Sequence, residues 1–236
     1  MSALLNVNKM THFFGGLRAV HNYNLTIEPH QITGLIGPNG AGKTTIFNLI
    51  TGVYTPTEGD IALQGENIKG LETNQIAARG LGRTFQNLAL WRHMTVLEHI
   101  KMAHYSQLSY GLIGAFFNTP KCRRQERDVK ENSYRLLELF DVKQHAEQLV
   151  VNLPYGAQRR VEMARAMATN PKILFLDEPT AGMTPDELVQ MINIIRQVHR
   201  DFKVAIFLLA HRLQFLMALC QHIQTLGFGE VIAEGP

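Results

Sequence analysis

Residues 37–45 read Gly-Pro-Asn-Gly-Ala-Gly-Lys-Thr-Thr. This stretch matches the pattern G-x-x-x-x-G-K-[ST], with Gly37, Gly42, Lys43 and Thr44 at the required positions. Glycines in such a loop let backbone N–H groups curl around phosphate oxygens, which a Cβ atom would obstruct. The stretch therefore predicts a phosphate-binding loop, and with it a fold that places the loop between a strand and a helix.

The sequence on both sides of the loop agrees with this prediction. Residues 31–36 form an apolar run typical of a strand, and residues 45–50 read as the start of a helix whose positive end would face the phosphates. In loops of this type the lysine, here Lys43, reaches the β- and γ-phosphates, and the hydroxyl of Thr44 is a ligand of Mg²⁺. The alternative is a glycine-rich turn that binds nothing, and it would make the agreement of strand, loop and helix accidental.

The composition describes a globular chain with a substantial core. Of the 236 residues, 45% are hydrophobic and 18% are charged, which suits one large domain or two small ones. The net charge of +3 is too small to indicate a nucleic-acid partner. Cys122 and Cys220 make no disulfide framework, so we expect two reduced thiols in a cytosolic protein.

Neither secretion nor a membrane span is predicted. Residues 1–8 have no positive region before an apolar stretch, so we expect no signal peptide. The most apolar window, residues 204–210, breaks after seven residues at His211, whereas a span needs about 20 nearly uncharged residues. A buried strand followed by an amphipathic helix is the better interpretation.

Strand patterns dominate the first third of the chain and return in its last third. Candidate strands are residues 4–7, 23–27, 59–63, 81–85, 172–176 and 204–209. Strands and helices alternate toward the end, which favours a mainly parallel sheet with helices on its faces. We predict an α/β fold in one domain, with an N-terminal antiparallel β part. Its catalytic core would be residues 1–87 and 170–236, and residues 88–169 an inserted helical subdomain.

Helix start signals support this division. Residues 95–98 and 184–187 are capping boxes, the second opening a helix to about Arg200, and residues 119–120 place a proline at the first position of another helix. In the helix that begins at this proline, a solvated surface is a better interpretation than an anion site for three arginines, Arg123, Arg124 and Arg127. The apolar segment 112–117 is compatible with core or with a docking surface.

A second motif is Ile173-Leu-Phe-Leu-Asp177-Glu178, an apolar strand that ends in two acids. At the carboxyl end of a strand in such a sheet, both carboxylates would lie beside the phosphate loop. Asp177 is then placed to bind the Mg²⁺ shell through water, and Glu178 to orient or deprotonate an attacking water. The alternative is an ordinary acidic helix cap.

Taken together, the motifs and their order resemble those of ABC-type ATPases, in particular the ATP-binding subunits of branched-chain amino-acid importers. The resemblance runs from about residue 4 to the end of the chain. It is carried by Phe14-Gly-Gly16, the phosphate loop, Arg83-Thr-Phe-Gln-Asn87, Leu153-Pro-Tyr-Gly-Ala-Gln-Arg-Arg160, Leu176-Asp-Glu-Pro-Thr180, His211, and the apolar segment with Asn118-Thr-Pro120 after it. It implies the fold of a P-loop NTPase.

The resemblance also implies roles for individual residues. Catalytic roles fall to Lys43, Gln86, Glu178 and His211. ATP contacts fall to Phe14, Val20, Asn39, Gly40, Ala41, Gly42, Lys43, Thr44 and Thr45, and to Gly156 of a second subunit. Mg²⁺ contacts fall to Thr44, Gln86 and, through water, Asp177. Phe14 would stack on adenine, although an isolated Phe is more typical of core. His211 would donate a hydrogen bond to the γ-phosphate, although by itself it also reads as an ordinary helix start.

The chain departs from the family pattern at several positions. The signature segment, normally Leu-Ser-Gly-Gly-Gln, keeps only Leu153 and Gly156, and has Pro154 and Ala157 in place of the serine and the glutamine. We expect backbone amides of the following helix to bind the phosphate instead of the serine hydroxyl. Three further departures are Thr184 for Asp or Asn, and Ala210 and Arg212 around His211. We expect activity to be retained, and truncation is one interpretation of the end at Pro236.

The implied function is an ATP-hydrolysing importer subunit that works as a homodimer, or as a heterodimer with a paralogue. Its expected partners are membrane permeases and, indirectly, a solute-binding protein, with no nucleic acid, at the cytoplasmic face of the membrane. The apolar residues after Gln86, namely Leu88, Leu90 and Trp91, are compatible with a surface for a permease helix or with core. The alternatives are an importer of urea, an amide or another amino acid, a soluble ABC ATPase acting on nucleic acid or ribosomes, and a P-loop kinase or GTPase.

Overall fold

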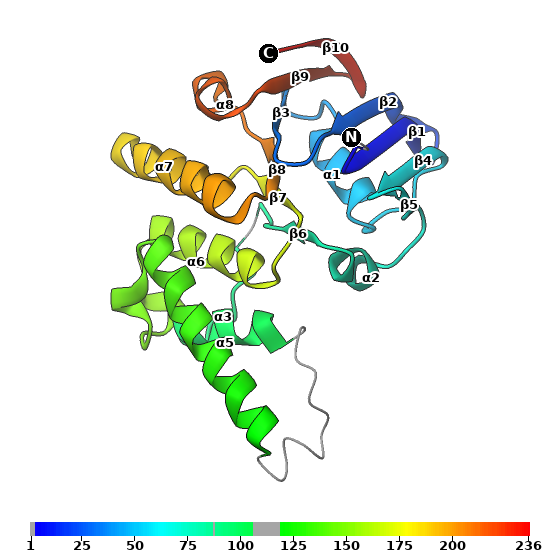
Figure 1. Ribbon diagram of the computed structural model, residues 1–236. Coiled ribbons are helices and arrows are strands. Elements are labelled where there is room, and N and C mark those ends of the chain that lie inside the picture. The colour runs from blue at the N-terminus through cyan, green and yellow to red at the C-terminus, as the bar shows by residue number, and fades with distance from the viewer. Residues whose placement is uncertain (1–2, 87, 106–118) are drawn as a thin grey trace. The chain divides into compact units, whose positions relative to one another are not determined.

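The computed structural model describes residues 3–86, 88–105 and 119–236, which form two compact units (Figure 1). The core unit comprises residues 1–86, 171–181 and 188–236, and the helical unit comprises residues 87–170 and 182–187. Residues 182–187, which we expected in the catalytic core, group with the helical unit. The apolar segment 112–117, with Asn87 and Asn118, lies outside the described residues.

The N-terminal part of the core unit is an antiparallel sheet with the strand order β2-β1-β4-β5. Its strands are β1 (Leu5–Phe14), β2 (Leu17–Ile27), β4 (Glu58–Leu63) and β5 (Glu66–Asn67). The expectation of strands at residues 4–7 and 23–27 is therefore too short. Register shifts interrupt β1 between Val7 and Met10, and Lys9 has a φ of +49°, so the apolar alternation stops before the strand does.

The second sheet has the order β10-β9-β3-β8-β7-β6 and is parallel except for β10, which pairs antiparallel with β9. Its strands are β3 (Ile32–Ile36), β6 (Leu81–Arg83), β7 (Ile173–Asp177), β8 (Ala205–Leu209), β9 (His222–Gly227) and β10 (Glu230–Gly235). This arrangement confirms the predicted α/β class. Parallel pairing brings the carboxyl ends of β3, β7 and β8 to one edge, where ligands bind in sheets of this kind.

Packed aromatic rings join the phosphate-loop helix to this sheet. The ring of Phe47, on α1 (Lys43–Ile50), lies 4.9 Å from the rings of both Phe175 on β7 and Phe207 on β8. All three side chains are fully buried. Rings packed at these distances contribute beyond their buried area, so the helix is held firmly where the loop ends. The remaining helices with residues in this unit are α2 (Thr73–Ala78), α7 (Pro185–Phe202) and α8 (Leu213–Leu219).

The helical unit is built on three helices that pack against one another, α3 (Val96–His104), α5 (Pro120–Leu139) and α6 (Tyr155–Ala168). Short 3₁₀ turns occupy Lys143–His145 and Val150–Asn152. The predicted capping box at residues 95–98 and the proline at the first position of α5 are both confirmed. Arg123, Arg124 and Arg127 of α5 are exposed, as a solvated surface requires. Among the helices of the described residues, none is long and apolar enough to cross a membrane.

Candidate functional site

The phosphate loop connects β3 to α1 in a shape that only glycine permits at two positions. A Cβ atom on Gly37 would lie 2.3 Å from the carbonyl oxygen of Leu226. One on Gly42 would lie 2.7 Å from the carbonyl oxygen of Ala19, and Gly42 also has a φ of +100°. Gly42 is the N-cap of α1 and has no side chain to cap it, so the first N–H groups of the helix face the loop. Such a helix start is an anion-binding site.

Lys43 lies inside the loop. Its side chain is buried, and the ammonium donates hydrogen bonds to the carbonyl oxygens of Gly37, at 2.7 Å, and Pro38, at 2.8 Å. Burial lowers the pKa of Lys43, and the carboxylates of Glu178 and Asp177 oppose that shift. A buried cation at the centre of the loop is well placed for a phosphate ligand.

The end of β7 holds the two acids in different environments. Asp177 is buried and accepts a hydrogen bond from Arg83, at 3.2 Å. The same guanidinium donates to the side chains of Asn48, at 2.8 Å, and Thr51, at 2.7 Å, and burial lowers its pKa. Asp177 is therefore held by Arg83, which also contacts the C-terminal end of α1, and Asp177 does not line the open site.

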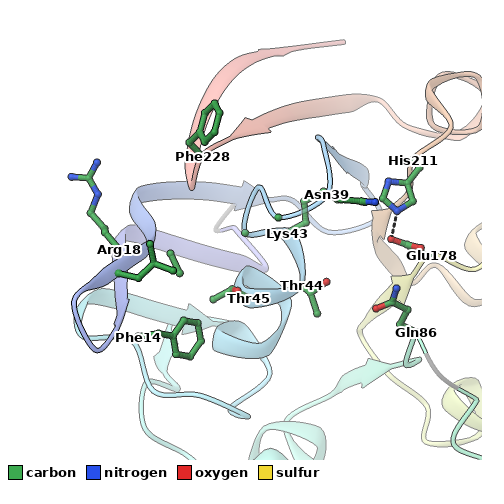
Figure 2. Close-up of a pocket in the computed structure, with 14 residues that line it drawn as sticks. Phe14, Arg18, Asn39, Lys43, Thr44, Thr45, Gln86, Glu178, His211 and Phe228 are labelled. Atoms are coloured by element: carbon green, nitrogen blue, oxygen red, sulfur yellow. Dashed lines mark ion pairs between the residues drawn. The ribbon is translucent and has the colours of Figure 1, made fainter.

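Glu178, in contrast, points into the open site. Its Oε1 lies 2.5 Å from Nε2 of His211, which follows β8 and is half-exposed (Figure 2). Glu178 has a φ of +48°, an uncommon backbone conformation for this residue type. Strain of this kind persists where surrounding structure holds a residue, and it concentrates at functional sites. The pairing joins the ends of two parallel strands through one carboxylate and one imidazole.

These groups share a pocket of about 780 Å³ in the core unit. Its lining residues are Phe14, Leu17, Arg18, Ala19, Asn39, Gly40, Gly42, Lys43, Thr44, Thr45, Gln86, Glu178, His211 and Phe228. Most of the residues predicted for the site are thus brought together (Figure 2). Phe14 is 42% exposed, which contradicts the alternative that it is core. His211 precedes α8 and its N-cap Arg212, so it is not a residue of the helix.

Three residues predicted to contact ATP do not line this pocket, and neither does Asp177, which was predicted to reach Mg²⁺ through water. Val20 and Ala41 are buried, and the carbonyl of Ala41 accepts a hydrogen bond from the N–H of Gly229. Gly156 belongs to the helical unit, in the first turn of α6. A Cβ atom there would lie 2.3 Å from Oε1 of Glu187, so a larger residue would require the carboxylate of Glu187 to move. The roles given to these three residues stay predictions.

Sequence reasoning missed several residues of the site. Leu17, Arg18, Ala19 and Phe228 line the pocket, and Arg83 holds Asp177. A signal for Phe228 exists in the sequence, because Phe228-Gly229 stands between two strand-like runs with the spacing of a tight hairpin. The others depend on tertiary contacts that no local pattern announces.

Near the start of the helical unit, the single tryptophan of the chain, Trp91, is 51% exposed. The guanidinium of Arg165 lies 5.4 Å from its ring centroid, and the backbone N–H of Trp91 donates to Nε2 of His99 at 2.9 Å. Leu88 and Leu90 are half-buried. The interpretation of this segment as simple core therefore does not hold for Trp91.

Known proteins provide the comparison that identifies the family. The family model described as "ABC transporter" matches residues 20–181. The chain is 42% identical, over 98% of its length and 91% of the relative's, to the high-affinity branched-chain amino acid transport ATP-binding protein LivG of Escherichia coli K12. It is 41% identical, over the same shares, to BraF of Pseudomonas aeruginosa, which carries the same description.

A solved structure agrees with these sequence comparisons. The ATP-binding cassette MJ1267 of an ABC transporter superposes with a TM-score of 0.86 at 27% identity, covering 100% of this chain and 92% of that one. The phosphate loop, the two acids at the end of β7 and His211 after β8 thus belong to a fold that this chain shares with that cassette. On these grounds the chain belongs to the ABC transporter family.

Proposed function

We propose that the chain is the ATP-hydrolysing motor subunit of an ABC importer for branched-chain amino acids. The observation that carries the proposal is a single pocket in which Lys43 and Thr44 of the phosphate loop face the Glu178–His211 pair. Lys43 and Thr44 are suited to bind the phosphates of ATP, and the Glu178–His211 pair is suited to act on the water that attacks them. The names of LivG and BraF support the same assignment.

The oxygen donors of the pocket fit Mg²⁺ as the second cofactor. Thr44 and Gln86 offer a hydroxyl and an amide oxygen, and the buried carboxylate of Asp177 suits a contact through water. The described residues contain no group of three His, Cys, Asp or Glu able to hold a metal unaided. Such a site suits Mg²⁺ bound jointly by protein and phosphates, where the ion would neutralise charge on the phosphate oxygens.

Glu178 and His211 divide the remaining work. The carboxylate of Glu178 lines the pocket, so it can orient a water molecule for in-line attack and accept its proton. His211 is half-exposed beside it and can donate its ring N–H to the terminal phosphate as charge develops there. Their 2.5 Å contact keeps the two groups aligned before ATP arrives.

The remaining components of the proposed importer are other protein chains. A second subunit, either a copy or a paralogue, would present Gly156 at the start of its α6 helix to the terminal phosphate. Trp91, with Leu88 and Leu90, offers an apolar surface for a permease helix. These contacts would hold the chain at the cytoplasmic face of the membrane, with a solute-binding protein reached only through the permeases. The net charge of +3 gives nucleic acid little attraction.

The identity of the transported solute is the most specific part of the proposal. LivG and BraF are named for branched-chain amino acids, whereas a lipopolysaccharide export protein, LptB of Haemophilus influenzae, is 31% identical over 99% of this chain. The higher identity favours leucine, isoleucine and valine. Importers of urea, of other amides or of another amino acid are the nearest alternatives.

Reconstitution tests the proposal. The chain is assembled in liposomes with the permease pair and binding protein of a branched-chain importer, and uptake of labelled leucine is measured with and without ATP on the motor side. We expect ATP-dependent uptake that excess isoleucine or valine inhibits, and none with Glu178→Gln. A chain that binds no permease but retains nucleic acid at moderate salt would contradict the importer assignment and support the rival class.

A further inference from the structure

We propose that Phe228, at the tip of the β9–β10 hairpin, is a nucleoside-binding residue whose ring packs on the base of the bound nucleotide. The proposal rests on the proposed function, since it requires a nucleotide at the phosphate loop. Phe228 lines the same pocket as Lys43 and Thr44, and it is 96% exposed. No role follows for it from the motifs of the sequence.

The arrangement of residues along the pocket places the base of a bound nucleotide on the side where Phe228 lies. Glu178, His211 and Gln86 lie on one side of the phosphate loop, and Phe14, Arg18 and Phe228 lie on the other (Figure 2). A triphosphate held at Lys43 with its terminal phosphate toward Glu178 must extend its nucleoside away from the catalytic pair. The nucleoside therefore reaches the side that carries the two phenylalanines.

The hairpin that carries Phe228 is hydrogen-bonded to the phosphate loop and to β2. Gly229 donates its N–H to the carbonyl of Ala41 in the phosphate loop and accepts a hydrogen bond from the N–H of His21, both at 2.9 Å. Arg18 and Glu230 form an ion pair, also at 2.9 Å. These contacts tie the turn to the phosphate loop and to β2, so the position of the ring is set before a ligand binds.

The backbone conformation of the β9–β10 turn is unfavourable for a phenylalanine, which indicates that Phe228 has a role in binding. The hairpin loop is Phe228-Gly229, and both residues have positive φ, +47° and +81°. Two-residue hairpin turns of this kind favour Asn-Gly or Asp-Gly, because a large side chain is disfavoured at positive φ. Burial within the chain does not compensate, since the ring is almost fully exposed. A residue that is costly for the fold and open to a ligand site is best explained by the ligand.

Stacking is the interaction that such a ring offers. Phe14, across the pocket, is held edge-on by His12 and Tyr54, with ring centroids at 4.7 Å and 5.3 Å, and is itself 42% exposed. Aromatic faces stack on every base, and neither phenylalanine can hydrogen-bond to a base edge. Phe228 should therefore strengthen the binding of adenine and guanine nucleotides to similar extents.

Nucleotide titrations on three variants test this inference. Dissociation constants are measured for ADP, GDP and inorganic tripolyphosphate, because ADP carries the base without the terminal phosphate and tripolyphosphate carries no base. For Phe228→Asn we expect the ADP and GDP constants to rise roughly fivefold to tenfold, with tripolyphosphate unchanged. Phe228→Trp should bind ADP at least as well as the wild type. Phe202→Asn replaces an exposed phenylalanine outside this pocket and should change nothing.

Each contrary outcome is informative. Phe228→Asn suits the turn, so it should melt no lower than the wild type, and a rise in its ADP dissociation constant cannot be attributed to a folding defect. Equal weakening of ADP and tripolyphosphate would overturn the inference, because the turn would then only support the phosphate loop. Unchanged ADP binding together with a loss of ATP-driven dimerisation would overturn it in favour of a subunit contact. A wild-type chain that binds none of the three ligands would refute the proposed function, and this inference with it.

Discussion

The core unit and the helical unit use their buried polar residues differently. In the core unit the phosphate loop, Lys43 and Asp177 lie at the ends of buried strands, and the backbone determines where they point. In the helical unit buried polar groups pair with one another away from any site, as Arg159 and Glu162 do within α6 at 3.0 Å. Polar residues of the core unit are therefore expected to matter mainly for chemistry, and those of the helical unit mainly for stability.

The largest effect should come from Glu178→Gln in the core unit. The amide keeps the shape of the side chain and can still accept from His211, but it cannot accept a proton. We expect the ATP turnover rate to fall about 10²- to 10⁴-fold, with ATP affinity and melting temperature retained. Turnover near that of the wild type would show that Glu178 is not the catalytic carboxylate. The exposed Glu138, changed to Gln, is the matched control and should leave all three quantities unchanged.

In the helical unit, Glu162→Ala should act on stability. The substitution removes the carboxylate that faces the guanidinium of Arg159, and both side chains are almost fully buried. Breaking a buried ion pair by removing one partner costs about 3–5 kcal/mol of unfolding free energy. Denaturant unfolding followed by the fluorescence of Trp91, the single tryptophan, measures this loss within the helical unit. A loss below about 1 kcal/mol would mean that the pair is not important for stability.

His99 should produce the smallest effect, and one that depends on pH. Its ring is fully buried, with Nε2 accepting from the Trp91 N–H and Nδ1 2.7 Å from the carbonyl oxygen of Thr95. Burial lowers the pKa of His99, and the hydrogen bond to Thr95 and the charges of Arg165 and Glu98 modify that shift. The folded state therefore favours the neutral form of the His99 ring. Its stabilisation is complete above the unfolded pKa of about 6.5 and is lost as pH falls below it.

The measurement compares wild type with His99→Asn between pH 7.5 and pH 5. We expect the unfolding free energy of the wild type to fall more steeply, by up to about 1.4 kcal/mol per pH unit. The pKa of His104 is also lowered by burial, but His104 is present in both proteins and cancels in the difference. Parallel stability profiles would mean that His99 does not titrate across the transition.

Much of the fold and of the site could be predicted because the signals are local. Gly37 to Thr44, Asp177 and Glu178 are read from short motifs, and the parallel sheet follows from the alternation of strands and helices. The full extent of β1 was missed because its pairing shifts register beyond Val7. Arg83 and Phe228 could not be assigned because their neighbours, Asp177 and the phosphate loop, are distant in the chain.

The sequence by itself determined the class of fold, the phosphate loop and the identity of the residues able to perform the chemistry. Each of these depends on neighbours a few residues apart, and backbone sterics act over that range. Only the tertiary structure decided that Glu178 meets His211, that Arg83 holds Asp177, and that Phe228 stands at the open end of the pocket. Those contacts join segments that meet only when the sheet forms, so they depend on strand order and register.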